Sequence, residues 1–383
     1  MKRHAEIAGA GFAGLTVAIA LLQRGWTARV HERSASLRAE GFGIAIQQNG
    51  LRTLQALGLD ELTLQRSIKI QRRVLCDSTG KATADLGISK HQIRISRKLL
   101  IEAMASKISE LGGEIIANSE VSAAEIGGEL QTTTGRKLKA DVIIAADGQA
   151  SVVRKSVGLV PRVRMKSDGA LRLVIRRQAE EVPPEGPEFG VTVENWAGHR
   201  RLIYSPCSRD ELYVAMSCLA SDATGTMVPI DFESWRRSLP HLNGLFDRIR
   251  EEANWSVVKW DRFKTIALPS WSAGKIAVVG DAAHAMPPNL AQGGGCAMMN
   301  ALSLATSLAE STTVLRALKE WERRERRLIE HTQRWSSLYG AVTSWSEGAR
   351  TLAFAAVERS SWLQRQLQMA ARHPPYGWRE RVG

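Results

Sequence analysis

The motif GAGFAG at positions 9–14 constrains the fold of this chain more than any other feature of the sequence. A short apolar run at 5–9 leads into it, and an Ala/Leu/Ile-rich segment at 13–24 follows and stops at Gly25, a common helix terminator. A second β-rich stretch, TARVHE, then ends at Glu32. Strand, glycine turn, helix, strand and terminal acid in this order predict a dinucleotide-binding βαβ unit.

The residues of this turn have distinct expected roles. Gly9 would make the turn, Gly11 would let the backbone approach a pyrophosphate, and Gly14 would let the helix pack closely on the strand. The helix N-terminus would present free amides and a positive dipole end to the phosphates. The residues of this unit expected to contact the cofactor are Gly9, Gly11, Phe12, Ala13, Gly14, Glu32 and Arg33. This unit leaves the choice between FAD and NAD(P) open.

Two later segments repeat one pattern, in which an apolar strand ends in an aspartate beside a glycine. The strand at 142–146 ends in Asp147-Gly148, and the strand at 276–279 ends in Gly280-Asp281. An Asp-Gly pair also suits a bare turn. Because ligands of parallel sheets lie outside the carboxyl ends of the strands, the two segments and GAGFAG together predict one long ligand across a single sheet edge.

The remaining segments predict an α/β fold with a Rossmann-like dinucleotide-binding domain, an inserted antiparallel-sheet substrate domain and C-terminal helices. Helices are expected at 49–65 and 94–113, a hairpin at 114–140, and a helix at 231–253 that breaks at Pro240. Helical breaks are expected near Gly340 and Gly348, followed by a loose tail over the last eleven residues. The expected domains are 1–160 (dinucleotide-binding), 161–265 (substrate), 266–300 (return of the dinucleotide-binding domain) and 301–383 (C-terminal helices).

The composition excludes several function classes. The net charge is +13, but basic and acidic residues alternate, as at 319–330, whereas a nucleic-acid-binding stripe would be uncompensated. The apolar run at 12–22 is too short for a membrane span. Four scattered cysteines without a CxxC pair, and no metal-ligand spacing, indicate reduced thiols in a cytoplasmic protein without a metal site.

The three motifs together resemble those of the group A flavin-dependent aromatic hydroxylases, the para-hydroxybenzoate hydroxylase family. The Asp-Gly pair with Arg154 matches one family motif. A second is matched by GDAAHAMPPNLAQGG at 280–294, although a glycine triplet and Asn300 replace the commoner Gly-x-Asn arrangement. Within the family, the stretches GAGFAGLTVAIAL, RLIYSPC, ELYVAM and GDAAHAMPPNLAQGGGCAM are most similar to the single-component pyridine-ring oxygenases.

This resemblance implies a monooxygenase that binds FAD and uses NADH or NADPH as co-substrate. A flavin C4a-hydroperoxide would hydroxylate, and in one outcome open, the ring of a hydroxylated aromatic or pyridine carboxylic acid. The expected partners are this small aromatic or N-heteroaromatic substrate, O₂ and NAD(P)H, with no nucleic acid and no membrane, in a monomer or homodimer. A flavin-dependent reductase or oxidase of the same fold is the alternative, and a non-enzymatic flavoprotein or basic nucleic-acid binder is a more distant one.

The resemblance also assigns roles to individual residues. Arg201 would bind a substrate carboxylate, Tyr213 would orient the ring hydroxyl, and Pro287 would lie beside the flavin and the substrate; a strand arginine and a core tyrosine remain the plain alternatives. The segment 70–73 lacks the aromatic residue of the pyridine oxygenases, so the substrate stays open. The other residues implied at the FAD site are Arg38, Arg97, Asp147, Gly280, Asp281, Pro288, Gly293 and Gly294.

A helix that begins near Gly294 would point its N-terminus at the flavin, where reduction places negative charge. Side chains would block so close an approach, which would explain the glycines. His284 and Cys296 belong to the same stretch and are expected to have structural and packing roles.

Overall fold

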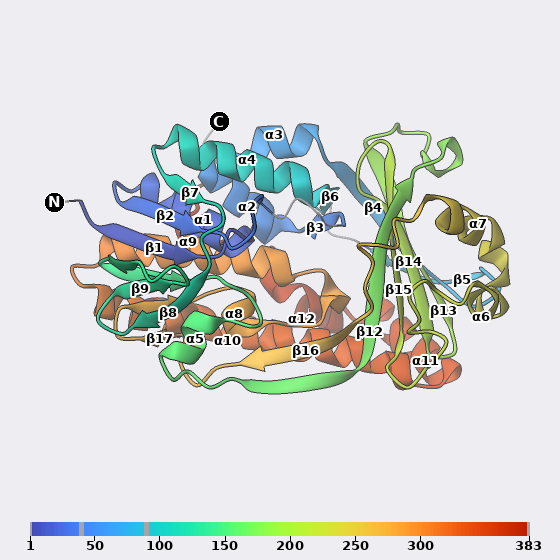
Figure 1. The fold of residues 1–383 in the computed structure, drawn as a ribbon. Helices are drawn as coiled ribbons and strands as arrows, with labels where there is room; N and C mark the ends of the chain where they lie inside the picture. The colour runs from blue at the N-terminus through green and yellow to red at the C-terminus, as the bar shows by residue number, and fades with distance from the viewer. Residues whose placement is uncertain (1, 38–41, 88–91, 381–383) are drawn as a thin grey trace.

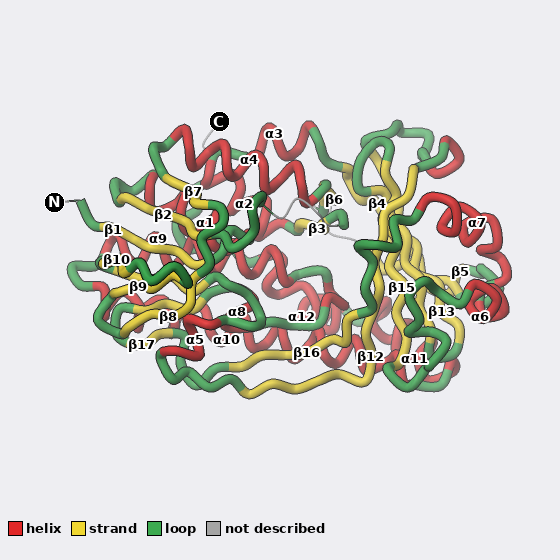
Figure 2. The backbone as a smooth tube through the Cα atoms, in the orientation of Figure 1, coloured by secondary structure: helices red, strands yellow, loops and turns green. Residues whose placement is uncertain are grey.

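The computed structural model describes residues 2–37, 42–87 and 92–380, and places a mostly parallel sheet beside a large second sheet (Figures 1 and 2). The first sheet is parallel except for its β17 edge. Ala8 pairs with both Ala145 and His31, and Ala145 pairs with Val278, so the carboxyl ends of these strands share one edge. Its strand order is β17 (Ser272–Ala273), β18 (Ile276–Val278), β11 (Val142–Ala145), β1 (His4–Ala8), β2 (Thr27–His31) and β7 (Glu114–Ile116).

Helices pack around this sheet and bury a continuous apolar core. Helix α1 (Phe12–Leu22) contacts both α4 (Arg97–Glu110) and α9 (Gly293–Glu310), and α9 in turn contacts α10 (Val314–Ala341). Helix α1 is apolar on all sides, as expected for a helix enclosed by other elements. A small antiparallel sheet of β8 (Val121–Glu125), β9 (Glu129–Thr132) and β10 (Lys137–Lys139) packs against α5 (Val152–Ser156).

The second sheet forms the other half of the molecule, and β12 and β16 extend from it alongside the first half (Figure 1). Trp235 and Phe246, on α6 (Phe232–Ser238) and α7 (Asn243–Glu252), are buried in its apolar cluster. Its strand order is β16 (Asp261–Ala267), β12 (Arg162–Arg176), β15 (Glu211–Leu219), β14 (Arg200–Pro206), β13 (Phe189–Ala197), β4 (Ile68–Cys76), β6 (Ile93–Ile95) and β3 (Ile44–Ile46), with β5 (Ala82–Gly87) paired to β4.

The second sheet is larger than the sequence predicts. Strands β3, β4, β5 and β6, all N-terminal to residue 100, belong to it, so residues 161–265 do not contain the whole sheet. The link is a parallel pairing of β4 with β13, in which Val74 pairs with Val193. Pairing between strands so far apart in sequence leaves no local pattern, which is why it was not predicted.

Two other local predictions are wrong. The helix expected at 49–65 is split into α2 (Gln48–Leu57) and α3 (Asp60–Gln65) by Gly58, which has a φ of 72°. The first arm of the expected hairpin divides, because β7 pairs in parallel with β2 in the main sheet and only β8 continues into the small sheet. The predicted break at Pro240 is confirmed, since a 3₁₀ turn there separates α6 from α7.

The C-terminal residues pack against the body of the protein, contrary to the predicted loose tail. After α11 (Glu347–Arg359) and α12 (Ser361–Arg372), the indole nitrogen of Trp378 donates to Gln55 on α2 at 2.7 Å. The guanidinium of Arg52 lies 4.8 Å from the centre of the same indole. These contacts with α2 lie outside any sequence pattern of the tail itself.

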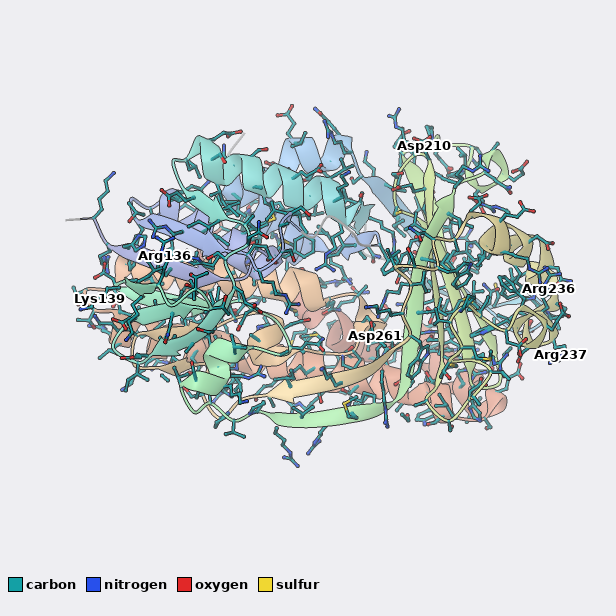
Figure 3. All side chains as sticks on the ribbon, in the orientation of Figure 1. Arg136, Lys139, Asp210, Arg236, Arg237 and Asp261 are labelled. Atoms are coloured by element: carbon teal, nitrogen blue, oxygen red, sulfur yellow. The ribbon has the colours of Figure 1, made fainter. Side chains whose placement is uncertain are left out.

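Charged side chains are distributed over the molecule. Arg136 and Lys139 lie at one end and Arg236 and Arg237 at the other, as Figure 3 shows. In the described part of the chain, no helix combines the length and apolarity needed to cross a membrane.

The glycine triplet at 293–295 has a packing role as well as the predicted binding role. A Cβ on Gly295 would lie 2.7 Å from Asn49 Oδ1, and a Cβ on Gly294 would lie 2.7 Å from Ile44 Cδ1. On the facing helix α2, a Cβ on Gly50 would lie 2.7 Å from Ile46 Cγ2 and 3.5 Å from Gly295 Cα. Helices α2 and α9 therefore cross closely through glycine, while Gly293 meets only the side chain of Met286.

Replacing Gly50 by alanine tests this crossing. We expect Gly50→Ala to destabilise the protein by about 1–3 kcal/mol, because the added methyl would lie 2.7 Å from Ile46 Cγ2 and 3.2 Å from Met298 Cε and would overpack this crossing. Urea unfolding followed by circular dichroism measures the change. The control is Gly348→Ala in α11, where a Cβ meets no atom within 4 Å, and which should be neutral or stabilising. Equal effects in the two variants would contradict the proposed crossing.

A buried carboxylate, Glu6, lies within the parallel sheet. Its oxygens contact His31 Nε2 at 2.7 Å, His4 Nε2 at 3.0 Å and Arg29 Nη1 at 3.1 Å. Burial raises the pKa of Glu6, but the hydrogen bonds to the two histidines and the charges of His31 and Arg29 outweigh burial and lower it to about 2 from the ordinary 4.5. The ionised form therefore stabilises the folded state.

This carboxylate should contribute to acid stability. Because the folded-state pKa is lowered, the contribution is complete above pH 4.5 and is lost as the pH falls towards 2. Glu6→Gln should therefore destabilise the protein at neutral pH, and the gap from the parent should shrink by about 2 kcal/mol between about pH 6 and pH 3. Urea unfolding of both proteins across this range measures the gap, and a gap independent of pH would refute the assignment.

Candidate active site

A cavity of about 860 Å³ lies at the junction of the two sheets and the C-terminal helices. One side is formed by the glycine turn at the start of α1 and by Gly280 and Asp281 after β18. The opposite side is formed by side chains of the second sheet, and α11 and α12 contribute Val357 and Leu367. The strand ends that the sequence predicts to converge therefore do converge on one space.

The glycine turn has the shape that a pyrophosphate requires. Gly9 has a φ of 100°, and a Cβ there would lie 2.5 Å from the carbonyl oxygen of Ala146. A Cβ on Gly14 would overlap the carbonyl oxygen of Gly9, so the helix packs directly on the turn. In contrast, a Cβ on Gly11 meets no atom within 4 Å, and Gly11 lines the cavity together with Phe12 and Ala13.

Glu32 follows β2 at the same sheet edge. Its two carboxylate oxygens accept the backbone N–H groups of Ala10 at 3.1 Å and Ser34 at 3.0 Å. A carboxylate has about four lone-pair positions, so these bonds fix its orientation and leave room for ribose hydroxyls. Arg33 is exposed and outside the cavity lining, and Arg38 lies outside the described residues.

Asp147 does not line the cavity but supports the loop beside it. Its Oδ2 accepts the backbone N–H groups of Val152 at 2.8 Å and Val153 at 3.3 Å, at the start of α5. Arg154 on α5 then donates to the carbonyl oxygens of Ala282 and Gln149. The structure thus gives the Asp-Gly motif a structural role that ties α5 to the Gly-Asp loop.

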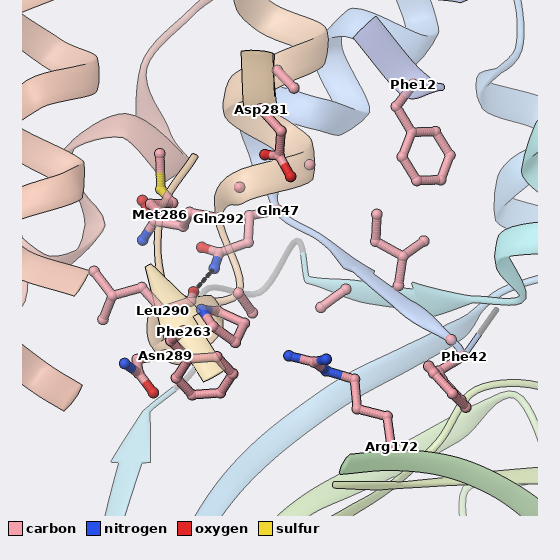
Figure 4. Close-up of a pocket in the computed structure, with 18 of the residues that line it drawn as sticks. Phe12, Phe42, Gln47, Arg172, Phe263, Asp281, Met286, Asn289, Leu290 and Gln292 are labelled. Atoms are coloured by element: carbon pink, nitrogen blue, oxygen red, sulfur yellow. Dashed lines mark hydrogen bonds between the residues drawn. The ribbon is translucent and has the colours of Figure 1, made fainter. Parts of the chain in front are cut away.

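Asp281 points into the cavity, and Figure 4 shows it on the same side as Phe12. Asp281 is exposed within the cavity, and its enclosure by the surrounding protein atoms raises its pKa, opposed by a hydrogen bond from Gln149 at 3.3 Å and by the charge of Arg97. The guanidinium of Arg97 lies 5.1 Å from the ring centre of Phe12. The preceding Gly280 is tightly packed, because a Cβ there would lie 2.9 Å from Ala13 Cβ.

The segment 286–294 forms the cavity wall next to Asp281. Met286, Pro288, Gly293 and Gly294 line the cavity, whereas Pro287 does not; its carbonyl oxygen accepts the Ser336 hydroxyl at 2.6 Å. Helix α9 begins at Gly293, so its free amides face this space. The carbonyl oxygen of Leu290 accepts the Gln47 side chain at 2.9 Å, the bond drawn in Figure 4.

Aromatic and basic side chains of the second sheet form the far half of the cavity. The guanidinium of Arg94 lies 4.7 Å from the ring centre of Tyr213, and that of Arg172 lies 5.6 Å from the ring centre of Phe263. In Figure 4, Arg172 points into the space between Phe42 and Phe263. This half of the cavity can therefore hold a flat aromatic ring and an acidic group.

A buried ionic cluster centred on Glu194 lies behind this wall. Glu194 is fully buried, and its carboxylate accepts Arg73 Nη2 at 2.6 Å and Arg201 Nη1 at 3.2 Å. Burial raises the pKa of Glu194, but the two arginines outweigh it and the pKa is lowered. Arg201 Nη2 donates to Asn289 Oδ1 at 3.0 Å, and Asn289 Nδ2 donates to the Ser336 carbonyl oxygen at 3.2 Å. The cluster joins the second sheet to the segment 286–294 and to α10.

The structure places Arg201, which the sequence resemblance assigns to the substrate, within this cluster. Its donors are engaged by Ser217 at 3.1 Å, by Glu194 and by Asn289, and Arg201 is not among the cavity-lining residues. A guanidinium already paired with a buried carboxylate is not available for a substrate carboxylate. Tyr213, by contrast, does line the cavity. The structure therefore separates two residues that the sequence places together at the substrate.

The residues present fit FAD. Gly11 opens onto the cavity without a clash, Glu32 is oriented at the strand end, and two helix N-termini face the same space. Gly11, Phe12 and Ala13 would hold the pyrophosphate and Glu32 the adenosine ribose, and the start of α9 would face the isoalloxazine. In the described residues, no cluster of three or more His, Cys, Asp or Glu side chains could hold a metal ion.

Sequence reasoning missed several residues of the far half of the cavity. Arg94 lies in the short stretch QIRIS, where nothing distinguishes it from a solvent-facing strand arginine. Arg73 and Glu194 come from strands that pair only in the folded protein. The other cavity-lining residues that were not predicted include Phe42, Gln47, Arg172, Phe263, Met286, Asn289, Gln292 and Tyr339.

Fold and site define a flavoprotein, and the chain belongs to the FAD binding domain family, which it matches over residues 3–335. A putative 2-heptyl-3-hydroxy-4(1H)-quinolone synthase of Rhodococcus erythropolis, AqdB1, is 37% identical over 378 residues, 98% of this chain and 97% of that protein. A 2-heptyl-3-hydroxy-4(1H)-quinolone synthase of Mycobacteroides abscessus is 35% identical over 363 residues, 93% of this chain and 95% of that protein.

A solved structure is also similar to this chain in sequence and in fold. The tetrameric form of 2-methyl-3-hydroxypyridine-5-carboxylic acid oxygenase superposes with a TM-score of 0.85 at 37% identity, and covers 98% of this chain and 97% of that chain. These similarities confirm the predicted fold class, the FAD cofactor and the reaction class, so the protein is an FAD-dependent aromatic monooxygenase.

The open space beside Gly11 gives a direct test of the cofactor site. We expect Gly11→Ala to fold with unchanged stability, because the added methyl meets no protein atom within 4 Å, but to bind FAD at least about tenfold more weakly, because the methyl occupies the pyrophosphate space. The flavin absorbance of the purified protein and FAD titration of the apoprotein measure this. Gly127→Ala, in a turn outside the cavity lining, is the control. Equal FAD affinity in the two variants would remove Gly11 from the site.

Proposed function

We propose that this protein uses NADH or NADPH and O₂ to hydroxylate an N-heteroaromatic ring that carries a hydroxyl or oxo substituent. The hydroxypyridine and hydroxyquinolone rings in the names of its relatives carry such substituents. Ring opening after hydroxylation is a second outcome within this proposal. The observation that carries it is the continuity of the cavity, which runs from the glycine turn to the aromatic wall around Tyr213 and Phe263.

The residues of the chain supply position and exclusion of water. When bound, FAD supplies the redox and oxygen-activating chemistry. The rings of Tyr213 and Phe263 and the side chains of Met286 and Leu290 offer apolar contacts to a flat ring, and they exclude water from the space beside the start of α9. The Glu194 cluster holds the segment 286–294 in place behind the ring.

Two further parts of the proposal concern the setting of the protein. We propose a cytoplasmic protein, because all four cysteines lie within the described residues as buried, free thiols. We also propose a monomer or homodimer. The tetrameric form of the pyridine oxygenase relative offers a third arrangement, which light scattering of the FAD-loaded protein would distinguish.

Anaerobic flavin reduction tests the proposed reaction. The FAD-loaded protein is mixed with NADH or NADPH, alone and with 6-hydroxynicotinate, 4-hydroxyquinoline or 3-hydroxybenzoate, and the bleaching rate is followed. We expect one of the N-heteroaromatic compounds to accelerate bleaching by at least about tenfold. In air, the same compound should gain one oxygen atom from labelled O₂. Rapid bleaching with no oxygenated product from any compound would instead favour the reductase or oxidase alternative.

A further inference from the structure

The most unusual group of the cavity wall is Arg94. Its side chain is 6% exposed, it lines the cavity, and it comes from the short strand β6, between β3 and β4. Its Nε has no hydrogen-bond partner, and no carboxylate in the described residues forms an ion pair with it. Its guanidinium lies 4.7 Å from the centre of the Tyr213 ring. A buried cation without an anion is costly, so its position indicates a missing partner.

The surroundings of Arg94 do not offset its charge. Burial lowers the pKa of Arg94, Tyr213 and Cys207 oppose this effect, and Arg73 lowers the pKa further. Cys207 packs beside it, but burial raises the pKa of this thiol to about 12, so the thiol stays protonated at neutral pH. Among the carboxylates of the second sheet, Glu194 is engaged by Arg73 and Arg201, and Glu211 accepts the Cys207 thiol at 3.9 Å. Near Arg94, the wall therefore keeps an excess of positive charge.

The packing around Arg94 also holds its side chain in place. A Cβ on Gly43 would overlap Cys207 and would lie at an ordinary contact distance of 3.6 Å from Arg94 Cδ, so the stem of Arg94 packs beside the Gly43 backbone and Cys207. The ring of Tyr213 supports the guanidinium from the other side. Arg94 is thus held by these contacts at the cavity wall.

We infer that Arg94, supported by Tyr213, binds an anionic oxygen of the aromatic substrate, and that it takes the role first expected of Arg201. This oxygen belongs either to a carboxylate or to an ionised hydroxyl group on the ring, and both would form charge-assisted hydrogen bonds with the guanidinium. Arg94 thereby sets the preference of the enzyme for acidic over neutral rings. This inference rests on the proposed aromatic substrate class.

Binding to the oxidised, FAD-loaded protein tests the inference without NAD(P)H or turnover. The carboxylate arm compares 6-hydroxynicotinate with 6-hydroxynicotinamide, using the change that each causes in the flavin spectrum. The hydroxyl arm uses 4-nitrophenol, whose absorbance shows whether its hydroxyl group is ionised. The pH titration of free 4-nitrophenol is compared with that of the bound compound. A failure to hydroxylate leaves both arms valid, so the inference and the proposed function fail separately.

In at least one arm, the parent protein should bind the anionic form about tenfold to a hundredfold more tightly than the neutral form. Arg94→Met should abolish this preference by weakening the anionic form alone, and Arg94→Lys should restore part of it. Arg172→Met removes the other cavity arginine that contacts a ring, which is the competing candidate for the anion, and the preference should fall less in Arg172→Met than in Arg94→Met. Unchanged flavin absorbance in each variant verifies that the FAD site is intact.

Three results would overturn the inference. The first is a parent protein that does not distinguish the anionic from the neutral form in either arm. The second is a preference that survives Arg94→Met or is lost only in Arg172→Met. The third is an equal weakening of both forms by Arg94→Met, which would give Arg94 a purely structural role.

Discussion

The architecture depends on a backbone contact at the carboxyl edge of the parallel sheet. Gly9 approaches the carbonyl oxygen of Ala146 so closely that no side chain fits, and Gly14 in turn lies directly on Gly9. This contact fixes where α1 begins relative to β11, and Gly280 extends the same close packing to Ala13. With these backbones in contact, Gly11 remains at the surface of the cavity, where a phosphate group can approach the amides.

The second sheet is attached to this edge through buried charge. Glu194 and its two arginines lie in the sheet, and the path through Asn289 reaches the loop before α9. Removing one member of such a cluster would leave a buried charge uncompensated, so the loop and the sheet are held in one relative position. The cluster explains why an arginine that resembles a substrate ligand in the sequence is instead part of the framework.

The sequence predicts the parallel half of the fold well, because each of its signals is local. A glycine turn with a strand before it and a helix after it is complete within about thirty residues. The second sheet is predicted less well, because the pairing of β4 with β13 and the position of β7 beside β2 depend on contacts between distant segments.

The same distinction applies to the site. Phe12, Asp281, Gly293 and Tyr213 line the cavity as the motifs indicate. The motifs also suggest Asp147, Pro287 and Arg201, which neighbour the cavity without lining it, because a motif specifies a loop but not which of its side chains turns inward. Arg94 has no motif, and its importance follows from burial and the lack of a partner, which are properties of the folded chain.

The attachment of Trp378 to α2 links the C-terminal segment to the centre of the protein. In the sequence, helix α12, which supplies Leu367 to the cavity wall, lies between helix α11 and Trp378. Arg52 and Gln55, which hold the indole, lie on the helix that carries Gly50 against Gly295. Truncating the chain before Trp378 would therefore loosen the crossing of α2 and α9 behind the flavin site. This would happen although every residue of the glycine motifs is unchanged.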